Sequence, residues 1–329
     1  MAQLLTVSRL LKNSVLLCLV FSDQLITLHV FKSKADSFIM SSEHLFSPPR
    51  EVVDISACYF YHMMDLPGYG EVGSEWDLRG GEEAYLGGIP FQGKRVLELG
   101  TASGFLCHYM EGRGARVIGF DLASDRSWDL VPFAGIDLSS LRVERRNHIE
   151  RLKNGWWFAH RLFGSQAKVM YGNIYDIPEG IGPIDIATFG LILCHLRDPF
   201  QALYSALRLT RESVVVTEWH PEQPAPQGHR MSLSPDASGL RRYLKRLLMR
   251  TGLVSPAWRH PRGMYFVPNP EGSDLTAETS TWWCFSAEVI CRFLGVMGFG
   301  DQVVTEHFQT YQGKRIRLYT VVGKRTRKI

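Results

Sequence analysis

Four residues in the stretch KRVLELGTASGFLCHYMEGRGARVIGFDL, residues 94–122, are of the types and spacing that a cofactor site needs. They are Glu98, Gly100, Gly104 and Asp121. The glycines let the chain turn tightly and approach a ligand closely, because no Cβ stands in the way. A carboxylate at Asp121 can accept two hydrogen bonds from a ribose diol. The spacing therefore predicts a site for a cofactor that contains adenosine.

The elements around these residues must bring the glycine turn and the second acid to one place. Short apolar runs predict buried strands at residues 95–99 and 116–120, and helical spacing predicts a helix over residues 105–113. A right-handed crossover makes the two strands parallel neighbours, so the turn and Asp121 meet at the carboxyl edge of the sheet. The helix begins near Ser103, and its first turn offers unpaired N–H groups to polar atoms there.

Two other cofactor classes fit this turn less well. A P-loop needs Gly-Lys-Ser/Thr after the turn, and GTASGF has no lysine. A nicotinamide dinucleotide fingerprint needs G-x-G-x-x-G, whereas Ala102 takes the third position and Cys107 stands three residues after Gly104.

An acid at the end of the first strand, a Gly-x-Gly/Ala-x-Gly turn and a second acid after the next strand resemble the first motifs of S-adenosylmethionine (SAM) dependent methyltransferases. The resemblance implies that Glu98 lies near the methionine amino group and that Asp121 holds the ribose hydroxyls. It also implies that Asn173 and Ile174, with Tyr175, hold the adenine, and that Phe189 and Gly190, at the end of the fourth strand, shape the pocket floor. The cofactor-binding residues expected in this way are Glu98, Gly100, Thr101, Ala102, Ser103, Gly104, Asp121, Leu122, Asn173, Ile174, Phe189 and Gly190.

The rest of the chain continues the same pattern. Further strands are predicted at residues 168–171, 184–189, 214–217, 302–308 and 315–322, and helices at residues 286–297 and from Asp198-Pro199 onward. Five parallel strands followed by an antiparallel pair is the methyltransferase order. We therefore expect an α/β, Rossmann-like methyltransferase fold with a mostly parallel seven-stranded sheet and helices on both faces.

The chain divides into four expected regions. Residues 1–39 are a presequence or an extension outside the domain, and residues 40–90 are an N-terminal lead-in or lid. Residues 91–219 and 282–329 form the SAM-binding core, and residues 220–281 form a long irregular insert that caps the substrate. A further insert, residues 131–165, contains a basic amphipathic helix leading into Trp156, Trp157 and Phe158, which either stack a ring or pack in the core.

The lead-in resembles a subgroup that includes the tRNA wobble-uridine carboxymethyltransferases, through YHMMDL and EWDLR. The resemblance implies a substrate or lid role for residues that precede the glycine turn: His62, Trp76 and Arg79, together with Asp65 and Asp77. Arg79 is of special interest because a guanidinium can clamp a carboxylate in two places, which leaves carboxymethyl transfer open. The alternative is a packed lead-in with a surface loop.

Residues at the ends of the fourth and fifth strands are the expected catalytic groups. His195 is the first candidate for a base or a positioning group, and Glu218 is the second. Trp219 and His220 are expected to contact the substrate. The loop LCHLRDP also resembles one in which the histidine packs or caps.

Composition limits the function classes. The chain has 329 residues, 45% hydrophobic content and a net charge of +4, so it can bury one large α/β core. Six cysteines without a C-x-x-C pair or zinc spacing indicate free thiols, no metal site and a cytoplasmic protein. The apolar run at residues 14–21 is too short to span a membrane.

Three functions remain open from the sequence. The first is a SAM-dependent methyltransferase acting on a small molecule. The second is an RNA-modifying enzyme, suggested by the lead-in and by basic segments at residues 142–153, 241–250 and 314–328, which otherwise are solvated faces. The third is a non-catalytic binding protein that kept the fold. The methylated atom and the oligomeric state are not determined by the sequence.

Overall fold

The computed structural model describes residues 15–22, 25–32, 42–126, 128–221, 263–271, 275 and 277–328. They belong to two compact units, Met1–Leu45 and Phe46–Ile329. In the first unit, β1 (Val15–Ser22) and β2 (Leu25–Lys32) form an antiparallel hairpin, and a short 3-10 turn, Ser42–Leu45, follows. This hairpin lies within the residues expected to form a presequence or extension.

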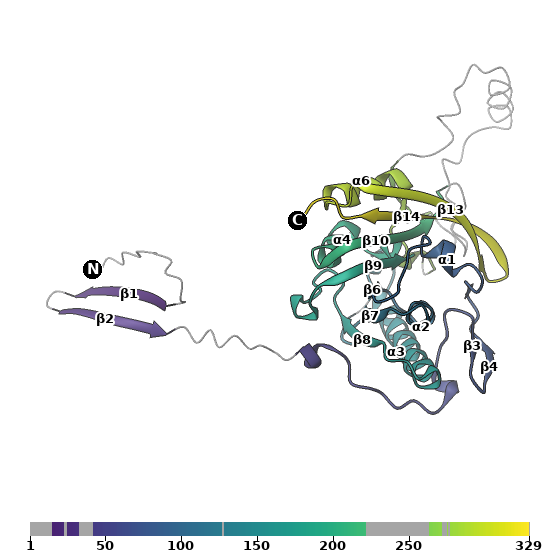
Figure 1. The fold of residues 1–329 in the computed structure, drawn as a ribbon, viewed down its shortest axis with the longest axis horizontal. Coiled ribbons are helices and arrows are strands. Elements are labelled where there is room, and N and C mark those ends of the chain that lie inside the picture. Colours follow the sequence, from purple (N-terminus) through teal and green to yellow (C-terminus); the bar gives the residue numbers. More distant parts are fainter. Residues whose placement is uncertain are drawn as a thin grey trace, which may run out of the picture. The chain divides into compact units, whose positions relative to one another are not determined.

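The second unit is built on one eight-stranded sheet with the order β5-β13-β14-β10-β9-β6-β7-β8 (Figure 1). Its strands are β5 (Trp76–Asp77), β6 (Arg95–Leu99), β7 (Arg116–Leu122), β8 (Lys168–Gly172), β9 (Ile184–Gly190), β10 (Thr210–Trp219), β13 (Asp301–Tyr311) and β14 (Lys314–Lys324). Five neighbouring strands run parallel, in the sheet order β10-β9-β6-β7-β8. Next to them, β14 pairs antiparallel with both β10 and β13. This confirms the expected strand order.

The eighth strand was not expected from the sequence. β5 comes from the lead-in and pairs antiparallel with the end of β13, where Trp76 faces Tyr311 and Asp77 faces Thr310. Two residues are too few to show a period, so nothing in the sequence pattern marks them as a strand. β5 draws the lead-in to the edge of the sheet.

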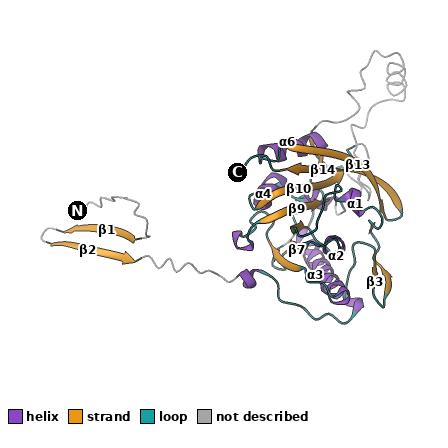
Figure 2. Ribbon diagram, viewed as in Figure 1, coloured by secondary structure: helices purple, strands orange, loops and turns teal. Residues whose placement is uncertain are grey.

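The α-helices lie beside the sheet (Figure 2). They are α1 (Glu82–Tyr85), α2 (Phe105–Gly112), α3 (Leu138–Phe163), α4 (Pro199–Leu207) and α6 (Ala287–Val296). α2 packs on β7, α4 on β10 and α6 on β14. The predicted start of α4 is confirmed, because Asp198 accepts a hydrogen bond from the backbone N–H of Gln201 at 2.9 Å and Pro199 opens the helix.

Two small hairpins and several 3-10 turns complete the described chain. The hairpins are β3 (Met64–Leu66) with β4 (Gly70–Val72), and β11 (Met264–Phe266) with β12 (Trp283–Phe285). The turns are Ile55–Ala57, Glu179–Ile181, Leu193–His195 and Ala277–Ser280. Most of the expected substrate cap, residues 220–281, lies outside the described residues, as does the basic segment 241–250. No helix in the described chain is long and apolar enough to cross a membrane.

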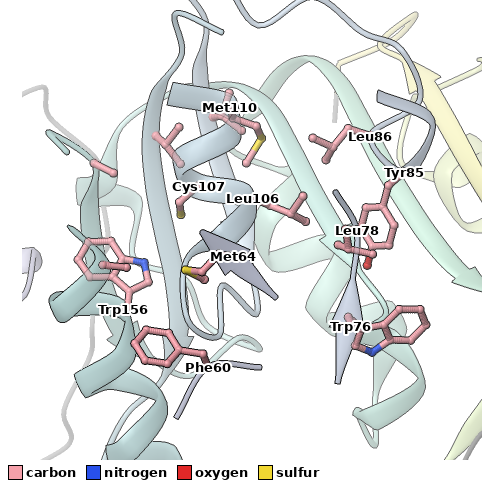
Figure 3. Close-up of a cluster of buried hydrophobic side chains, with 14 of the residues drawn as sticks. Phe60, Met64, Trp76, Leu78, Tyr85, Leu86, Leu106, Cys107, Met110 and Trp156 are labelled. Atoms are coloured by element: carbon pink, nitrogen blue, oxygen red, sulfur yellow. The ribbon is translucent and has the colours of Figure 1, made fainter. Parts of the chain in front are cut away.

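The lead-in contributes to the main hydrophobic core. Figure 3 shows lead-in side chains from Phe60 to Leu86 beside α2, with Trp156 of α3 next to them. Trp156 and Phe158 are completely buried, and Trp157 is 4% exposed. The aromatic stripe of α3 therefore packs in the core, which is the second of its two expected roles.

Candidate active site

A cavity of about 620 Å³ opens at the carboxyl ends of the parallel strands. Its walls come from the glycine turn, the ends of β7, β8, β9 and β10, the lead-in, α3 and the end of β13. The expected site residues that line it are His62, Trp76, Gly100, Ala102, Asp121, Leu122, Asn173, Ile174, Gly190, His195 and Trp219. The other expected site residues do not line this cavity.

The glycine turn depends on backbone conformations that side chains rarely adopt. Gly100 has a φ of +77° and Gly104 a φ of +86°. A Cβ on Gly104 would also stand 2.7 Å from Cδ1 of Trp156, closer than carbon atoms pack. Ala102 adopts a φ of +48°, so the turn keeps a left-handed conformation at this position although the residue is an alanine and not a glycine.

Asp121 is held at the sheet edge by the turn that it faces. Its two carboxylate oxygens accept hydrogen bonds from the backbone N–H groups of Ala102 at 2.8 Å and Leu122 at 2.7 Å. Burial raises the pKa of this carboxyl, while the two N–H donors act in the opposite direction. Each oxygen keeps a second lone pair, so the carboxylate can still accept from two hydroxyl groups of a ribose.

Glu98 lies beneath the turn instead of in the cavity wall. Its carboxylate accepts hydrogen bonds from the Thr101 hydroxyl at 3.0 Å and the Cys107 thiol at 2.7 Å. Burial raises its pKa to about 7, and it borders a much smaller neighbouring pocket of about 20 Å³ with Gly100 and Gly190. In this structure the side chain therefore supports the underside of the turn.

The segment after β8, which was expected to hold the adenine, forms part of the cavity wall. Asn173 and Ile174 line it, and the side-chain oxygen of Asn173 accepts a hydrogen bond from the backbone N–H of Tyr175 at 3.1 Å. The Tyr175 hydroxyl donates to Asp129, which also lines the cavity. These contacts fix the segment that carries Asn173 and Ile174 at the edge of the sheet.

Besides Glu98, four expected cofactor residues do not line the cavity: Thr101, Ser103, Gly104 and Phe189. Thr101 is bonded to Glu98, and the Ser103 hydroxyl accepts a hydrogen bond from the backbone N–H of Tyr61 at 3.2 Å. Phe189 is 1% exposed within the sheet. These residues support the cavity wall by contacting the residues that line it or that lie beside them.

His195 projects from the turn that follows β9 and lines the cavity. Its Nδ1 lies 2.6 Å from the backbone carbonyl oxygen of Ser280. Because a carbonyl can only accept, Nδ1 carries the proton and Nε2 of the neutral ring is the nitrogen with a lone pair. The contact therefore fixes a tautomer that can take up a proton at Nε2.

Glu218 and His220 flank a residue that does face the cavity. Glu218 is 1% exposed, and its carboxylate accepts a hydrogen bond from the backbone N–H of Leu193 at 3.2 Å. Burial raises its pKa to about 8. His220 is 7% exposed, with Nε2 3.5 Å from a carboxylate oxygen of Glu306. Of the three consecutive residues, only Trp219 lines the cavity.

The lead-in residues divide into two groups. His62 and Trp76 line the cavity, and burial lowers the pKa of His62 to about 4, so its ring is neutral at pH 7. Arg79 instead binds carboxylates of its own segment, with Nε and Nη2 on Asp77 at 2.8 and 2.9 Å. Its guanidinium also pairs with Asp65 at 3.1 Å and Glu71 at 2.9 Å, away from the main cavity.

Sequence reasoning missed several polar and aromatic residues of the wall. The most prominent are Tyr61, Glu75, Tyr85 and Tyr311. Tyr85 reaches the floor closely enough that a Cβ on Gly190 would stand 2.7 Å from its hydroxyl oxygen. No motif spacing marks these residues, since they come from a short helix, loop positions and the last residue of a C-terminal strand.

The geometry suits a reaction that depends on placing two molecules in line. The turn and Asp121 fix one end of the cavity, and side chains from the lead-in, β10 and β13 surround the other. Such positioning by itself supplies much of the rate of a displacement reaction. Among the described residues, no three His, Cys, Asp or Glu side chains are grouped to hold a metal ion.

Comparisons with known proteins agree with this description. Residues 82–261 match the family model described as "Methyltransferase domain". The match covers more than half of the chain, and the chain therefore belongs to the methyltransferase domain family. A search of curated proteins found no significant match.

Solved structures with a similar chain path include three methyltransferases. The 1,6-didemethyltoxoflavin N1-methyltransferase of Burkholderia thailandensis is 12% identical with a TM-score of 0.43, over 76% of this chain and 78% of the other. The magnesium protoporphyrin IX methyltransferase of Synechocystis is 14% identical with a TM-score of 0.37, over 71% and 75%. A SAM-dependent methyltransferase from Aquifex aeolicus is 14% identical with a TM-score of 0.38, over 76% and 95%. At these values none of them identifies the substrate of this chain.

The cofactor of the site is SAM. Family membership assigns it, and the residues present fit it. Gly100 turns with a left-handed φ beside the cavity, each carboxylate oxygen of Asp121 keeps a lone pair beyond its bond to a backbone N–H, and Asn173 and Ile174 line the same cavity.

Proposed function

We propose that the protein is a methyltransferase that transfers the methyl group of SAM to a small-molecule acceptor by in-line displacement. The observation that supports this most directly is that Asp121, His195 and Trp219 all line one cavity. Its volume of about 620 Å³ lies within the range of roughly 300–1000 Å³ that small-molecule sites occupy.

His195 is the proposed base or positioning group. Bound SAM supplies a methyl carbon on a positively charged sulfur, which makes that carbon open to attack. With Nδ1 donating to Ser280, Nε2 can accept the proton of an acceptor O–H or N–H group as the new bond to the methyl carbon forms. Glu218 is proposed to act indirectly, by holding the backbone of the turn that carries His195.

The first experiment separates cofactor binding from transfer. Calorimetric titration of the full chain with SAM, S-adenosylhomocysteine and NAD should show binding of the two adenosyl ligands and no binding of NAD. Methyl incorporation from labelled SAM into a small-molecule fraction then tests transfer. Binding without any transfer to small molecules or RNA would support the third function, a binding protein that kept the fold.

His195→Gln tests the proposed role of the histidine. The variant should keep its affinity for SAM, lose at least about tenfold in kcat, and lose the acidic limb of the pH–rate profile, since that limb reports protonation of the base. An unchanged pH profile would argue for a packing role.

An RNA acceptor is the second candidate, supported by the resemblance of the lead-in to tRNA-modifying enzymes. Its test is affinity for bulk tRNA that falls steeply with salt, because phosphate contacts release counterions. Carboxymethyl transfer would require a cation facing the methyl group, and Arg79 is instead bound to Asp65, Glu71 and Asp77. We therefore expect Arg79→Ala to leave the preference between SAM and its carboxylated analogue unchanged.

We also propose that the protein works in the cytoplasm. Five cysteines, Cys58, Cys107, Cys194, Cys284 and Cys291, are free thiols, as expected in a reducing compartment. Fractionation of cells that express the full chain would test this localisation.

A further inference from the structure

Three aromatic rings border the end of the cavity away from Asp121. Trp76 lies 5.3 Å from Trp219 and 4.8 Å from Tyr311, measured between ring centroids, with interplanar angles of 48° and 54°. Trp219 and Tyr311 are 6.4 Å apart at 84°. The three residues come from β5, β10 and β13, and all three line the cavity. Tilted rings in contact present both faces and edges to a flat guest molecule.

Glu75 places a carboxylate among these rings. One of its oxygens accepts a hydrogen bond from the Tyr59 hydroxyl, and the other accepts from the Tyr311 hydroxyl at 3.1 Å. The residue precedes Trp76 directly and lines the cavity. Two tyrosine donors fix the carboxylate in position and leave lone pairs on both oxygens.

No cation of the described chain neutralises this carboxylate. None of the ion pairs among the described residues includes Glu75. The nearby His62 ring is buried and neutral at pH 7. Arg126 and Arg145 also line the cavity, but Arg126 follows β7 and Arg145 lies on α3, whereas Glu75 directly precedes β5, toward the other end of the sheet order. A partly buried carboxylate that accepts two hydrogen bonds but faces no cation of the described residues favours a positively charged or N–H-bearing guest.

We infer that the acceptor is a planar ring compound that carries a protonated nitrogen, with the ring against Trp219 and Tyr311 and the nitrogen on Glu75. This inference rests on the proposed function and narrows its substrate class. The ring faces favour a flat and positively charged guest through stacking and cation–π attraction. The carboxylate adds a charge-assisted hydrogen bond and disfavours an anionic guest. Recognition of this nitrogen does not fix which atom receives the methyl group.

The test measures binding of three matched probes to the full chain saturated with S-adenosylhomocysteine. The probes are 4-aminoquinoline, whose ring nitrogen is protonated at pH 7, 4-hydroxyquinoline, which is neutral, and quinoline-4-carboxylate, which is an anion. Calorimetry should find aminoquinoline bound at least about tenfold more tightly than hydroxyquinoline, and quinoline carboxylate weakest, since charge-assisted hydrogen bonds exceed neutral ones by this order.

Two variants assign the effect to the carboxylate. Glu75→Gln should weaken aminoquinoline roughly tenfold to hundredfold and leave hydroxyquinoline within about twofold. Glu83→Gln is the matched control, because it removes the same charge from an exposed lead-in residue that does not line the cavity. Affinity for S-adenosylhomocysteine, measured on each variant, shows that the fold is intact.

The outcomes separate the two proposals. Equal affinity for the three probes, no binding of any probe, or an unchanged affinity in Glu75→Gln would overturn this inference while the proposed function stands. Failure of the unaltered chain to bind S-adenosylhomocysteine would overturn the proposed function itself. A simple alkylammonium ion that bound as tightly as aminoquinoline would overturn the requirement for a ring.

Discussion

The two halves of the cavity are built in different ways. On the proposed cofactor side, the wall is made by backbone groups and by residues at the carboxyl ends of strands, such as Asp121, which accepts from the N–H of Ala102. On the proposed acceptor side, side chains come from the lead-in, β10 and β13, as Trp76, Trp219 and Tyr311 do. The cofactor half is therefore a local property of a strand, turn and helix, whereas the acceptor half exists only after distant segments have packed together.

This difference bears on how each half tolerates change. A backbone site requires particular φ values and close contacts, so its weak points are glycines and buried neighbours. A site made of side chains can change its preference through single substitutions while the fold persists. The following substitutions test that contrast, from the largest expected effect to the smallest.

Gly104→Ala should destabilise the fold by about 2–4 kcal/mol, measured by urea unfolding, because it combines a left-handed φ with overpacking. The added Cβ would stand 2.7 Å from the buried ring of Trp156. Gly112→Ala on the same helix is the control, since that glycine has open space and no left-handed φ. Equal stability of the two variants would refute the view that the turn is set by backbone geometry.

Asp121→Asn should reduce SAM affinity roughly tenfold to hundredfold, measured by calorimetry, with a smaller effect on stability. The carboxylate accepts from two N–H groups, and an amide would turn one donor of its own toward one of them. Asp176→Asn changes an exposed aspartate outside the cavity and should bind SAM normally. Retained affinity in Asp121→Asn would remove this residue from the cofactor half.

Glu218→Gln tests how the acceptor half is supported. Burial raises the pKa of Glu218 from its ordinary value of 4.5 to about 8. The folded state then binds a proton more tightly than the unfolded state does, so this group's contribution to stability is complete below about pH 4.5 and is lost as pH rises toward about 8. The glutamine variant should therefore lose less stability than the unaltered chain between about pH 5 and about pH 8.

Unfolding curves of both proteins at the two pH values provide the measurement for Glu218. Parallel declines in stability would contradict the proposed protonation. Glu98, whose pKa is raised to about 7, keeps part of the decline in both proteins and serves as an internal reference.

Ala102→Gly should have the smallest effect. Glycine relieves the cost of a left-handed φ of +48°, but it also loses more entropy on folding, so stability should change by less than about 1 kcal/mol. SAM affinity should stay within about twofold. A large loss of affinity on calorimetry would mean that the Cβ of Ala102 itself contacts the cofactor.

The contrast also explains which parts could be predicted from sequence. Asp121 and Asn173 follow apolar runs that predict strands, and parallel strands bring their carboxyl ends to one edge. No comparable rule predicts which way a side chain points when its residue lies in or beyond a long loop. Glu218 ends a predicted strand, yet its carboxylate turns to the backbone of Leu193, and Tyr311 enters the cavity from the far end of the sequence.

Two hydrogen bonds at the end of α1 determine when the lead-in opens as the molecule unfolds. The backbone carbonyl of Tyr85, at the end of α1, accepts hydrogen bonds from the buried hydroxyls of Thr217 on β10 and Thr320 on β14. The lead-in is thereby joined to the middle of the sheet. Its amides near Leu86 should exchange with deuterium as slowly as those of β10, as members of one cooperative unit.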